Sequence, residues 1–351
     1  MNFLKSLIFL CSHLVIINSA YAFPTTPATH LCPVRQVYEF ALNTWLENLA
    51  VRSNGDILVT ELLPAPNLYL IDPFSPKKSP TLVHTFPNAL GLLGITEVTP
   101  DVFAIISGNF TFTASIPGSY SVSLVDLKNW TDDGNCAPKV TKVINVDAAS
   151  LLNDIIVLNR DEGLLLSPDS TLGVVFLINI KTGAYQIVLS DPLMKPTSPT
   201  APTGINGMKL IGNTLYFTNS AQRIYASIPI HLSNGTAAGP ATIIAHSLTN
   251  TSSYDDFIID KRTGAAYLAT QTGNSIARIT LQGEQRIIAG NSDSTAIAEP
   301  TAVQFGRTSV DRNVLYVTTG GGLGGPINGT VSVGGQLVAI DLDRCGLQMY
   351  S

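Results

Sequence analysis

Short segments rich in Val, Ile, Leu, Thr and Tyr recur along the chain, with Gly, Asn, Asp and Pro between them. This pattern predicts β-strands separated by turns. The six clearest segments are Ile57–Glu61, Val102–Ser107, Gly163–Ser167, Thr214–Asn219, Ala265–Gln271 and Val314–Thr319. Each is followed by a second strand, and the first five also by a third. Their starts lie 45, 61, 51, 51 and 49 residues apart, and helical periodicity is not sustained beyond residue 22.

The near-constant spacing predicts an all-β fold, a six-bladed β-propeller with roughly 50 residues in each blade. The sixth unit lacks a third strand of its own. The N-terminal strand Val34–Ala41 is otherwise without a partner, so we expect it to pair with Gln336–Leu342 and close the ring. Closure removes the open sheet edge that a linear array would expose. A two-domain β-sandwich is the alternative, but it does not explain the regular spacing.

The first 22 residues have the pattern of a secretory signal peptide. Lys5 supplies a positive charge, Leu7–Ile17 an apolar run, and Ala20–Ala22 the small-x-small pattern of a cleavage site. We therefore predict a signal peptide at 1–22 and a single propeller domain at 23–351, secreted or held in the lumen of the secretory pathway. No other apolar run is long enough to span a bilayer, so no membrane anchor is expected.

The amino-acid composition excludes some classes of protein and of partner. Of the 351 residues only 13% are charged and 45% are hydrophobic, with a net charge of −5. This balance excludes a disordered chain, and the lack of a basic excess argues against nucleic acid as a partner. A polar, weakly charged surface suits a glycoprotein. Five N-x-Ser/Thr sequons support this, at Asn109, Asn129, Asn234, Asn250 and Asn328.

Three cysteines remain once the predicted signal peptide is removed: Cys32, Cys136 and Cys345. If the first and last strands pair antiparallel, Cys32 and Cys345 meet at the same end of the sheet, where a disulfide would clasp the ring. Three single pairings are possible among three cysteines, and Cys136 lies in a turn of the second unit. The wide spacing argues against a cysteine metal site.

Functional side chains are expected where the chain leads into the innermost strand of each blade, because these segments line one mouth of the axial channel. The six lead-in segments are Trp45–Asn48, Gly94–Glu97, Leu152–Asp154, Gly204–Gly207, Tyr254–Phe257 and Glu299–Ala302. Nearly every one carries a carboxylate or carboxamide beside apolar residues. Such oxygens can hold calcium or bind a polar small molecule. They can also simply satisfy backbone groups at turns.

Several of these motifs resemble those of fungal proteins in the senescence-marker/gluconolactonase superfamily. The matching stretches cover almost the whole predicted mature chain: Glu47–Gly55 with Ile57–Thr60, Leu152–Asp154, Ser167–Ser170 with Gly173, Lys181–Gly183, Gly204–Met208, Asp255–Phe257 and Pro300–Ala302. In metal-dependent lactonases of that superfamily, a Glu, an Asn and an Asp at these places hold the cation. The resemblance therefore implies Glu47, Asn153 and Asp255 as ligands of calcium or another divalent cation, with Asp256 as a candidate base.

A secreted fungal branch with these motifs includes the hetero-Diels-Alderases of tropolone-sesquiterpenoid pathways, which join a quinone methide to a humulene-type polyene. The second lead-in segment is apolar where lactonases have an Asn, which favours this branch. The resemblance implies a protein that needs no cofactor for cycloaddition and acts on a small apolar substrate; the sequence does not determine the oligomeric state, and a monomer is the default expectation. Its funnel would be lined by Trp45, Leu92, Leu93, Ile95, Tyr254 and Phe257, with Asn153, Asn206 and Thr301 as polar anchors.

Three functions thus stay open: a cyclase, a metal-dependent lactone hydrolase and a non-catalytic binding propeller. A Ser-His-Asp hydrolase is disfavoured, because the chain has no Gly-x-Ser-x-Gly motif and no histidine in a lead-in segment. The glycine run Gly320–Gly325 is predicted to be a flexible turn, since no helix follows it to form a phosphate site.

Overall fold

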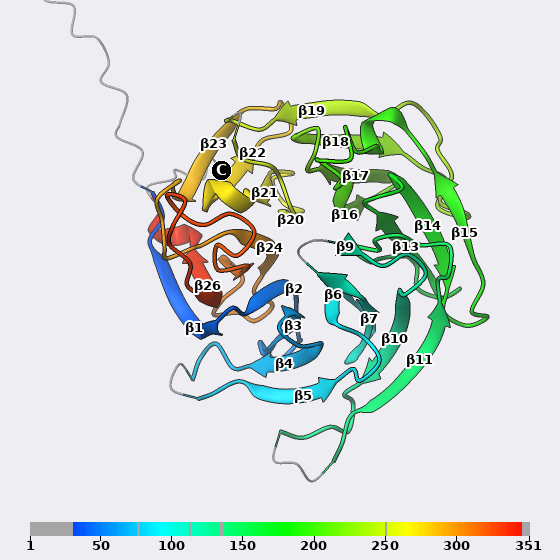
Figure 1. Cartoon of the computed structure of the whole chain (residues 1–351), viewed down its shortest axis with the longest axis horizontal. Helices are drawn as coiled ribbons and strands as arrows, with labels where there is room; N and C mark the ends of the chain where they lie inside the picture. Colours follow the sequence, from blue (N-terminus) through cyan, green and yellow to red (C-terminus); the bar gives the residue numbers. More distant parts are fainter. Residues whose placement is uncertain (1–30, 76–77, 112–113, 133–135, 250, 346–351) are drawn as a thin grey trace, which may run out of the picture.

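The computed structural model describes residues 31–75, 78–111, 114–132, 136–249 and 251–345. Six four-stranded antiparallel sheets are arranged as blades around a central axis (Figure 1). The predicted six-bladed β-propeller is therefore confirmed. The predicted signal peptide and the sequon at Asn250 lie outside the described residues. In the part of the chain that is described, no helix is long and apolar enough to cross a membrane.

Each of the first five blades uses four consecutive long strands. Blade 1 comprises β2 (Trp45–Val51), β3 (Ile57–Leu63), β4 (Asn67–Ile71) and β5 (Thr81–Thr85). Blade 2 comprises β6 (Gly91–Thr99), β7 (Val102–Gly108), β10 (Ser121–Asp126) and β11 (Lys139–Asn145), with the small hairpin β8 (Phe110–Thr111) and β9 (Ala114–Ser115) inserted. Blade 3 comprises β12 (Ile156–Asn159), β13 (Leu164–Asp169), β14 (Val174–Asn179) and β15 (Tyr185–Leu189).

The second half of the ring repeats this plan. Blade 4 comprises β16 (Ile205–Ile211), β17 (Thr214–Asn219), β18 (Ile224–Pro229) and β19 (Thr242–His246). Blade 5 comprises β20 (Phe257–Ile259), β21 (Ala266–Ala269), β22 (Ser275–Ile279) and β23 (Gln285–Gly290). Blade 6 comprises β24 (Pro300–Phe305), β25 (Val314–Thr319), β26 (Gly334–Asp341) and the N-terminal β1 (Val34–Leu42). Three short 3₁₀ turns are η1 (Pro192–Met194), η2 (Gln271–Gly273) and η3 (Leu342–Arg344).

The innermost strands correct one expectation. The six strands predicted most clearly from the pattern were expected to be innermost, but each is the second strand of its blade. The innermost strands are formed, or directly preceded, by the segments that were predicted to lead into them. The reason is local irregularity: the register shifts between Leu46 and Asn48 in β2, and between Leu92 and Ile95 in β6. Such bulges break the two-residue alternation by which a strand is recognised.

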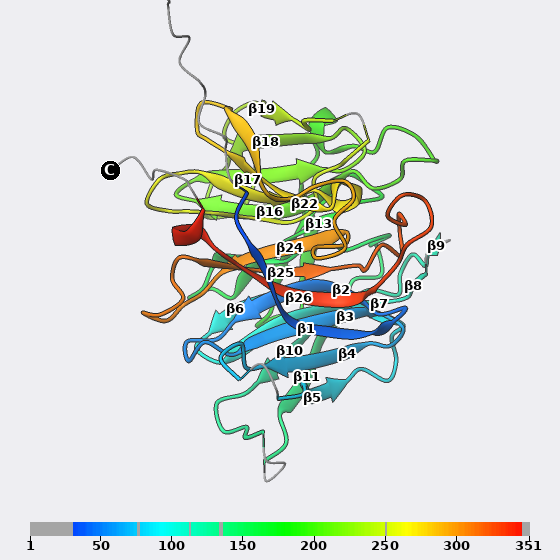
Figure 2. The same cartoon turned by 90° about the vertical axis from the view of Figure 1, so that its left-hand side faces the viewer.

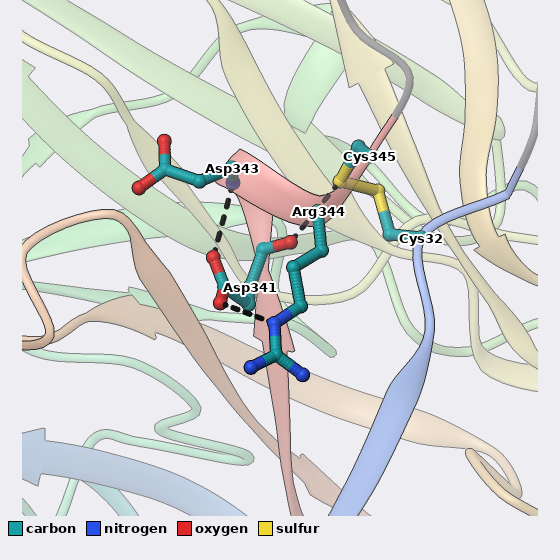
Figure 3. Close-up of a disulfide and its surroundings, with 5 residues drawn as sticks. All are labelled: Cys32, Asp341, Asp343, Arg344 and Cys345. Carbon is teal, nitrogen blue, oxygen red and sulfur yellow. Dashed lines mark hydrogen bonds and ion pairs between the residues drawn. A yellow bond between two sulfur atoms is a disulfide. The ribbon is translucent and has the colours of Figure 1, made fainter.

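The ring closes as predicted. Strand β1 pairs antiparallel with β26, with Val34 opposite Ile340, and the two strands run side by side across the edge of the molecule (Figure 2). The disulfide Cys32–Cys345 joins the ends of this pair, with Cα atoms 4.4 Å apart (Figure 3). Cys136 is a free, exposed cysteine. Of the three possible pairings, the one that clasps the first and last strands is the one formed.

The chain next to the disulfide is held by a short hydrogen-bonded turn. The side chain of Asp341 accepts a hydrogen bond of 3.0 Å from the backbone N–H of Asp343, which caps η3 (Figure 3). Its carboxylate also lies 3.2 Å from Nε of Arg344. The turn therefore fixes the direction in which the chain leaves β26 and brings Cys345 against Cys32.

The core lies between neighbouring blades rather than inside one blade. Ile106 of blade 2 and Phe176 of blade 3 belong to one buried cluster, and Leu58 of blade 1 lies with Phe103 of blade 2 in another. Each sheet thus buries both faces, which leaves its innermost strand to surround the axis. We call the end where the innermost strands begin the upper face, and the end where they finish the lower face.

Candidate functional site

Five carboxylates, from Glu47, Asp154, Asp255, Asp256 and Glu299, meet near the axis at the upper ends of the innermost strands, and all five residues are buried. They come from blades 1, 3, 5 and 6. The charges of Asp154, Asp256 and Glu299 each raise the pKa of Glu47, which reflects their proximity. Because burial disfavours the ionised forms, such a cluster needs protons, cations or hydrogen-bond donors for compensation.

Glu47 and Glu299 are held beneath the glycine run. Nε1 of Trp45 donates a 2.6 Å hydrogen bond to Oε2 of Glu47, and the backbone N–H of Gly324 donates one of 2.9 Å to Glu299. A Cβ added at Gly320 or Gly324 would lie 3.0 Å or less from the indole ring. The glycine run, predicted to be a flexible turn, thus forms a loop against Trp45 and Glu299 that admits no side chain at these two positions.

Asp255 lies beside two carboxamides. Nε2 of Gln271 donates a 2.9 Å hydrogen bond to Oδ2 of Asp255, and the Asn206 side chain also lowers the pKa of this carboxyl group. The amide nitrogen of Asn206 donates to Oγ of Ser220 at 2.9 Å, whereas its Oδ1 is buried without a hydrogen-bond partner. An unpartnered buried oxygen next to a carboxylate is a ready ligand for a cation or a donor.

Lys209 neutralises the other part of the cluster. Its Nζ lies 2.6 Å from Oδ1 of Asp256 and 3.2 Å from Oδ2 of Asp154, and only 13% of its side chain is exposed. Nδ2 of Asn48 donates a further hydrogen bond of 3.2 Å to Asp256. With both oxygens engaged, Asp256 is tied up and is a poor candidate for the general base suggested by the sequence.

The electrostatics of this cluster oppose ionisation. Burial raises the pKa of Glu47, Asp256 and Glu299 to about 7 in each case. Burial, followed by the charge of Glu47, raises the pKa of Asp255 well above its usual range. For Lys209, burial lowers the pKa, but attraction by Asp154 and Asp256 outweighs it and the net pKa is raised. The site therefore holds protons near neutral pH.

These shifts predict a pH-dependent stability. In the unfolded chain the carboxyl groups ionise near pH 4, so at pH 5 to 7 the folded state holds more protons than the unfolded one. The melting temperature, measured with a chelator present, is expected to fall as the pH rises from about 5 to about 8. Glu299→Gln, which can still accept from Gly324, should flatten this slope, whereas the exposed control Glu284→Gln should not. Equal slopes in both variants would contradict the prediction.

The predicted polar residues divide into two groups. Glu47, Asn153, Asp255 and Asn206 lie at the upper axis with little exposure. Thr301 is instead engaged in the fold: its hydroxyl donates to the carbonyl of Leu46 at 2.7 Å and lies 3.0 Å from Oγ1 of Thr318. Thr301 therefore links blade 6 to blade 1. Its role as a substrate anchor stays a prediction.

The predicted apolar wall is mostly core. Leu92, Leu93, Tyr254 and Phe257 are buried within clusters between blades. Their role as substrate contacts remains a prediction. Ile95 is different, because it lines the two cavities described next.

A cavity of about 630 Å³ opens on the lower face. A second cavity, of about 220 Å³, adjoins it, and we call this one the inner cavity. The two cavities have six lining residues in common: Ile95, Thr96, Ile258, Ile259, Lys261 and Gln304. The second cavity also reaches Asp154 and Lys209. The two adjoining cavities, with walls of both aliphatic and polar side chains, therefore extend from the lower face to the ion pair that bounds the carboxylate cluster.

Lys209 and Glu299 are the residues that sequence reasoning passed over. Lys209 stands between the apolar residues Met208 and Leu210 in β16, and this is the signal that could have revealed it, because a lysine is rarely buried without a charged partner. Glu299 stood in a lead-in segment without an assigned role. Its surroundings are formed by the distant loop Gly320–Gly325, which folds over it.

The predicted metal ligands fit a hard cation in part. Glu47 accepts from Trp45 through Oε2, Asp255 accepts from Gln271 through Oδ2, and Asn206 adds its unpartnered Oδ1. Oxygen ligands of this kind suit calcium. Within the described residues, however, no three side chains of His, Cys, Asp or Glu are grouped so that they could hold a metal ion. The amides of Asn153 and Asn206 would have to complete the set.

The sequons lie between strands, as expected for a glycan site. Asn129, Asn234 and Asn328 are exposed in turns. Asn109 is half-buried after β7, and its Oδ1 is buried without a hydrogen-bond partner. Glycosylation of these residues stays a prediction.

Comparison with known proteins gives related sequences and folds. No protein-family model matches the chain. It is 25% identical over 323 residues to a protein of Sarocladium schorii, asR5, named as a candidate hetero-Diels-Alderase, and the match covers 82% of this chain and 78% of that protein. It is 24% identical over 315 residues to a protein of a Phoma species given the same function in its name, covering 84% and 89%.

Solved structures share the fold at lower identity. A luciferin-regenerating enzyme superposes with a TM-score of 0.64 at 15% identity, covering 90% of this chain and 96% of that one. The calcium-binding protein regucalcin of Agrobacterium tumefaciens gives 0.59 at 16%, covering 88% and 95%. A candidate gluconolactonase gives 0.57 at 12%, covering 89% and 93%. The resemblance inferred from the motifs is confirmed: the chain is a six-bladed β-propeller related in sequence to fungal proteins named as hetero-Diels-Alderases and similar in fold to gluconolactonase-like propellers.

Proposed function

We propose that the chain is a hetero-Diels-Alder cyclase that joins a tropolone quinone methide to a humulene-type polyene. The observation that carries the proposal is the similarity to two proteins of that name along more than four fifths of this chain. The reaction needs no nucleophile, so the protein has to bring two apolar partners together in a reactive arrangement and keep water away.

The lower-face cavity suits this task. Its walls include Leu49, Ile95, Ile258 and Phe305, and its volume of about 630 Å³ is within the range of sites for small molecules. These apolar side chains would contact the polyene. We take this cavity, rather than the crowded upper ends of the strands, as the reaction chamber.

Lys209 supplies the polarising group. Its ammonium borders the inner cavity while two of its hydrogens serve Asp154 and Asp256. A third donor is left for the enone oxygen of a bound quinone methide, where a positive charge stabilises the electron density that develops during cycloaddition. Asn153, Asn206 and Thr301, the anchors predicted from the sequence, line neither of these two cavities.

The test is cycloaddition with the purified protein. The informative readout is the excess of one stereoisomer together with the rate above that of a protein-free control. The wild type is expected to give one dominant stereoisomer. Gln304→Trp should abolish this preference, because Gln304 lines both cavities and the indole would fill them. The exposed control Gln282→Trp should behave as wild type.

A racemic product at the background rate with the wild-type protein would overturn the proposal. The alternative is lactone hydrolysis dependent on a divalent metal. It is favoured by the carboxylate oxygens of Glu47 and Asp255 beside the unpartnered oxygen of Asn206. Together with Asn153 these residues would hold an ion that polarises the lactone carbonyl and activates water. Calcium-dependent hydrolysis of a sugar lactone, lost in Asp255→Ala, would favour this alternative.

A further inference from the structure

The rim of the lower-face cavity is cationic, although the chain as a whole is acidic. Five basic residues line the cavity against two acidic ones: Arg160, Lys261, Arg262, Arg307 and Arg312 against Glu97 and Asp260. The net charge of the whole chain is −5. A quarter of its 20 lysines and arginines are therefore gathered around one opening. Such a concentration of one sign creates a local potential that favours anions.

Most of these cations have protein partners. Nη1 of Arg307 lies 2.6 Å from Oε2 of Glu97, Nη2 of Arg262 lies 3.4 Å from Asp260, and Arg160 donates to backbone carbonyls, including that of Glu97 at 3.2 Å. Lys261 and Arg312, both exposed, have no hydrogen bond or ion pair with another described residue. They are thus the two rim cations whose charge is available to a ligand.

Behind the rim lies an apolar belt. Blades 2, 3, 4 and 5 contribute Ile95, Ile155, Ile156, Val157, Leu210, Ile211, Ile258 and Ile259 to the inner cavity. The inner end is bounded by Asp154, whose carboxylate is already paired with Lys209. The two cations without a protein partner therefore lie on the side of the opening, whereas the ammonium of Lys209 at the far end is already shared by the carboxylates of Asp154 and Asp256.

We propose that this cavity binds amphipathic organic anions, with the apolar body in the aliphatic belt and the anionic group at Lys261 and Arg312. Burial of the apolar body provides most of the affinity, and the two cations set the orientation, because at the inner end the single charge of Lys209 is outnumbered by the carboxylates of Asp154 and Asp256. This inference goes beyond the proposed function and does not depend on it, because the two cycloaddition partners named above are apolar.

The experiment compares ligands of one shape and different charge. Decanoate, decanol and decylammonium are titrated into the purified protein by calorimetry. Decanoate is expected to bind at one site at least tenfold more tightly than decanol, with an affinity that falls as salt is added, and decylammonium is expected to bind more weakly still. The double variant Lys261→Gln/Arg312→Gln should bind decanoate no better than decanol while leaving the affinity for decanol unchanged.

Two further variants separate the outcomes. Gln304→Trp should abolish binding of both decanoate and decanol, and the exposed pair Lys128→Gln/Lys139→Gln should leave both affinities unchanged. Equal affinity for decanoate and decanol, no binding of either, or full decanoate affinity in the Lys261/Arg312 double variant would overturn the inference. Since binding is measured without turnover, a protein that prefers decanoate but gives only racemic cycloadduct would contradict the proposed function alone.

Discussion

Replacing Lys209 by methionine is expected to lower the free energy of unfolding by about 3–5 kcal/mol. The substitution preserves most of the side-chain volume but leaves Asp154 and Asp256, both buried, without their shared cation. An uncompensated buried carboxylate is far less stable than a paired one. The loss should be larger at pH 8 than at pH 5, because at low pH a carboxylate without its cation can bind a proton instead.

Urea titrations of the wild type and the variant at both pH values measure this effect. Lys142→Met, at an exposed position, is the matched control and should change the free energy by no more than about 0.5 kcal/mol. The triple variant Lys209→Met/Asp154→Asn/Asp256→Asn should recover much of the loss, because the asparagines can still accept the backbone hydrogen bonds of Ile155 and Phe257. A loss below about 1 kcal/mol for Lys209→Met would show that the carboxyl groups are already neutral.

Removing the disulfide Cys32–Cys345 is expected to lower the free energy of unfolding by a similar amount. In the variant Cys32→Ser/Cys345→Ser the closing pair of strands is held by hydrogen bonds and side-chain packing alone. The disulfide spans a sequence separation of 313 residues, and a cross-link over so long a loop removes much freedom from the unfolded chain, so we expect a loss of about 4 kcal/mol. The denaturation midpoint in urea, compared under identical conditions, measures it.

Cys136→Ser provides the control, since this exposed thiol pairs with no other cysteine in the structure. It should leave the midpoint unchanged and also removes thiol exchange as a complication. A loss below about 1 kcal/mol in the double variant would mean that pairing of β1 with β26 is sufficient for closure.

The closed ring of blades could be predicted from the sequence because the same strand pattern occurs six times along the chain. One alternating segment such as Val314–Thr319 is weak evidence for a strand, but six at similar spacing indicate a propeller. The closing strand followed from the missing third strand of the last unit, and Cys32 and Cys345 supplied an independent check on the same pairing. Each of these inferences concerns backbone architecture, which a two-residue period and a repeat length are sufficient to define.

The site was less predictable, because its partners come from different blades. Lys209 is 55 residues from Asp154 and 47 from Asp256, and nothing local in the sequence links the three. The carboxylates were expected at the axis, but a cation among them was not. Likewise, Glu299 and the loop that covers it belong to different segments of the chain, so their contact depends on how β25 ends.

The apolar residues show a different limit. Leu92, Leu93 and Ile95 are close together in one strand, yet only Ile95 reaches the cavities. The register of β6 shifts between Leu92 and Ile95, and a shift by one residue exchanges the faces to which side chains point. Residue type alone therefore cannot distinguish a cavity wall from the interior between two blades.

The closing strand also has a consequence for synthesis. Strand β1 is the first of the propeller strands to be translated, and its partner β26 is among the last. Until β26 is made, the edge of β1 has no native partner and Cys32 has no native thiol, whereas Cys136 is already present. A nascent chain in an oxidising compartment could therefore form a non-native disulfide between Cys32 and Cys136. The final blade is completed only after nearly the whole domain has been synthesised.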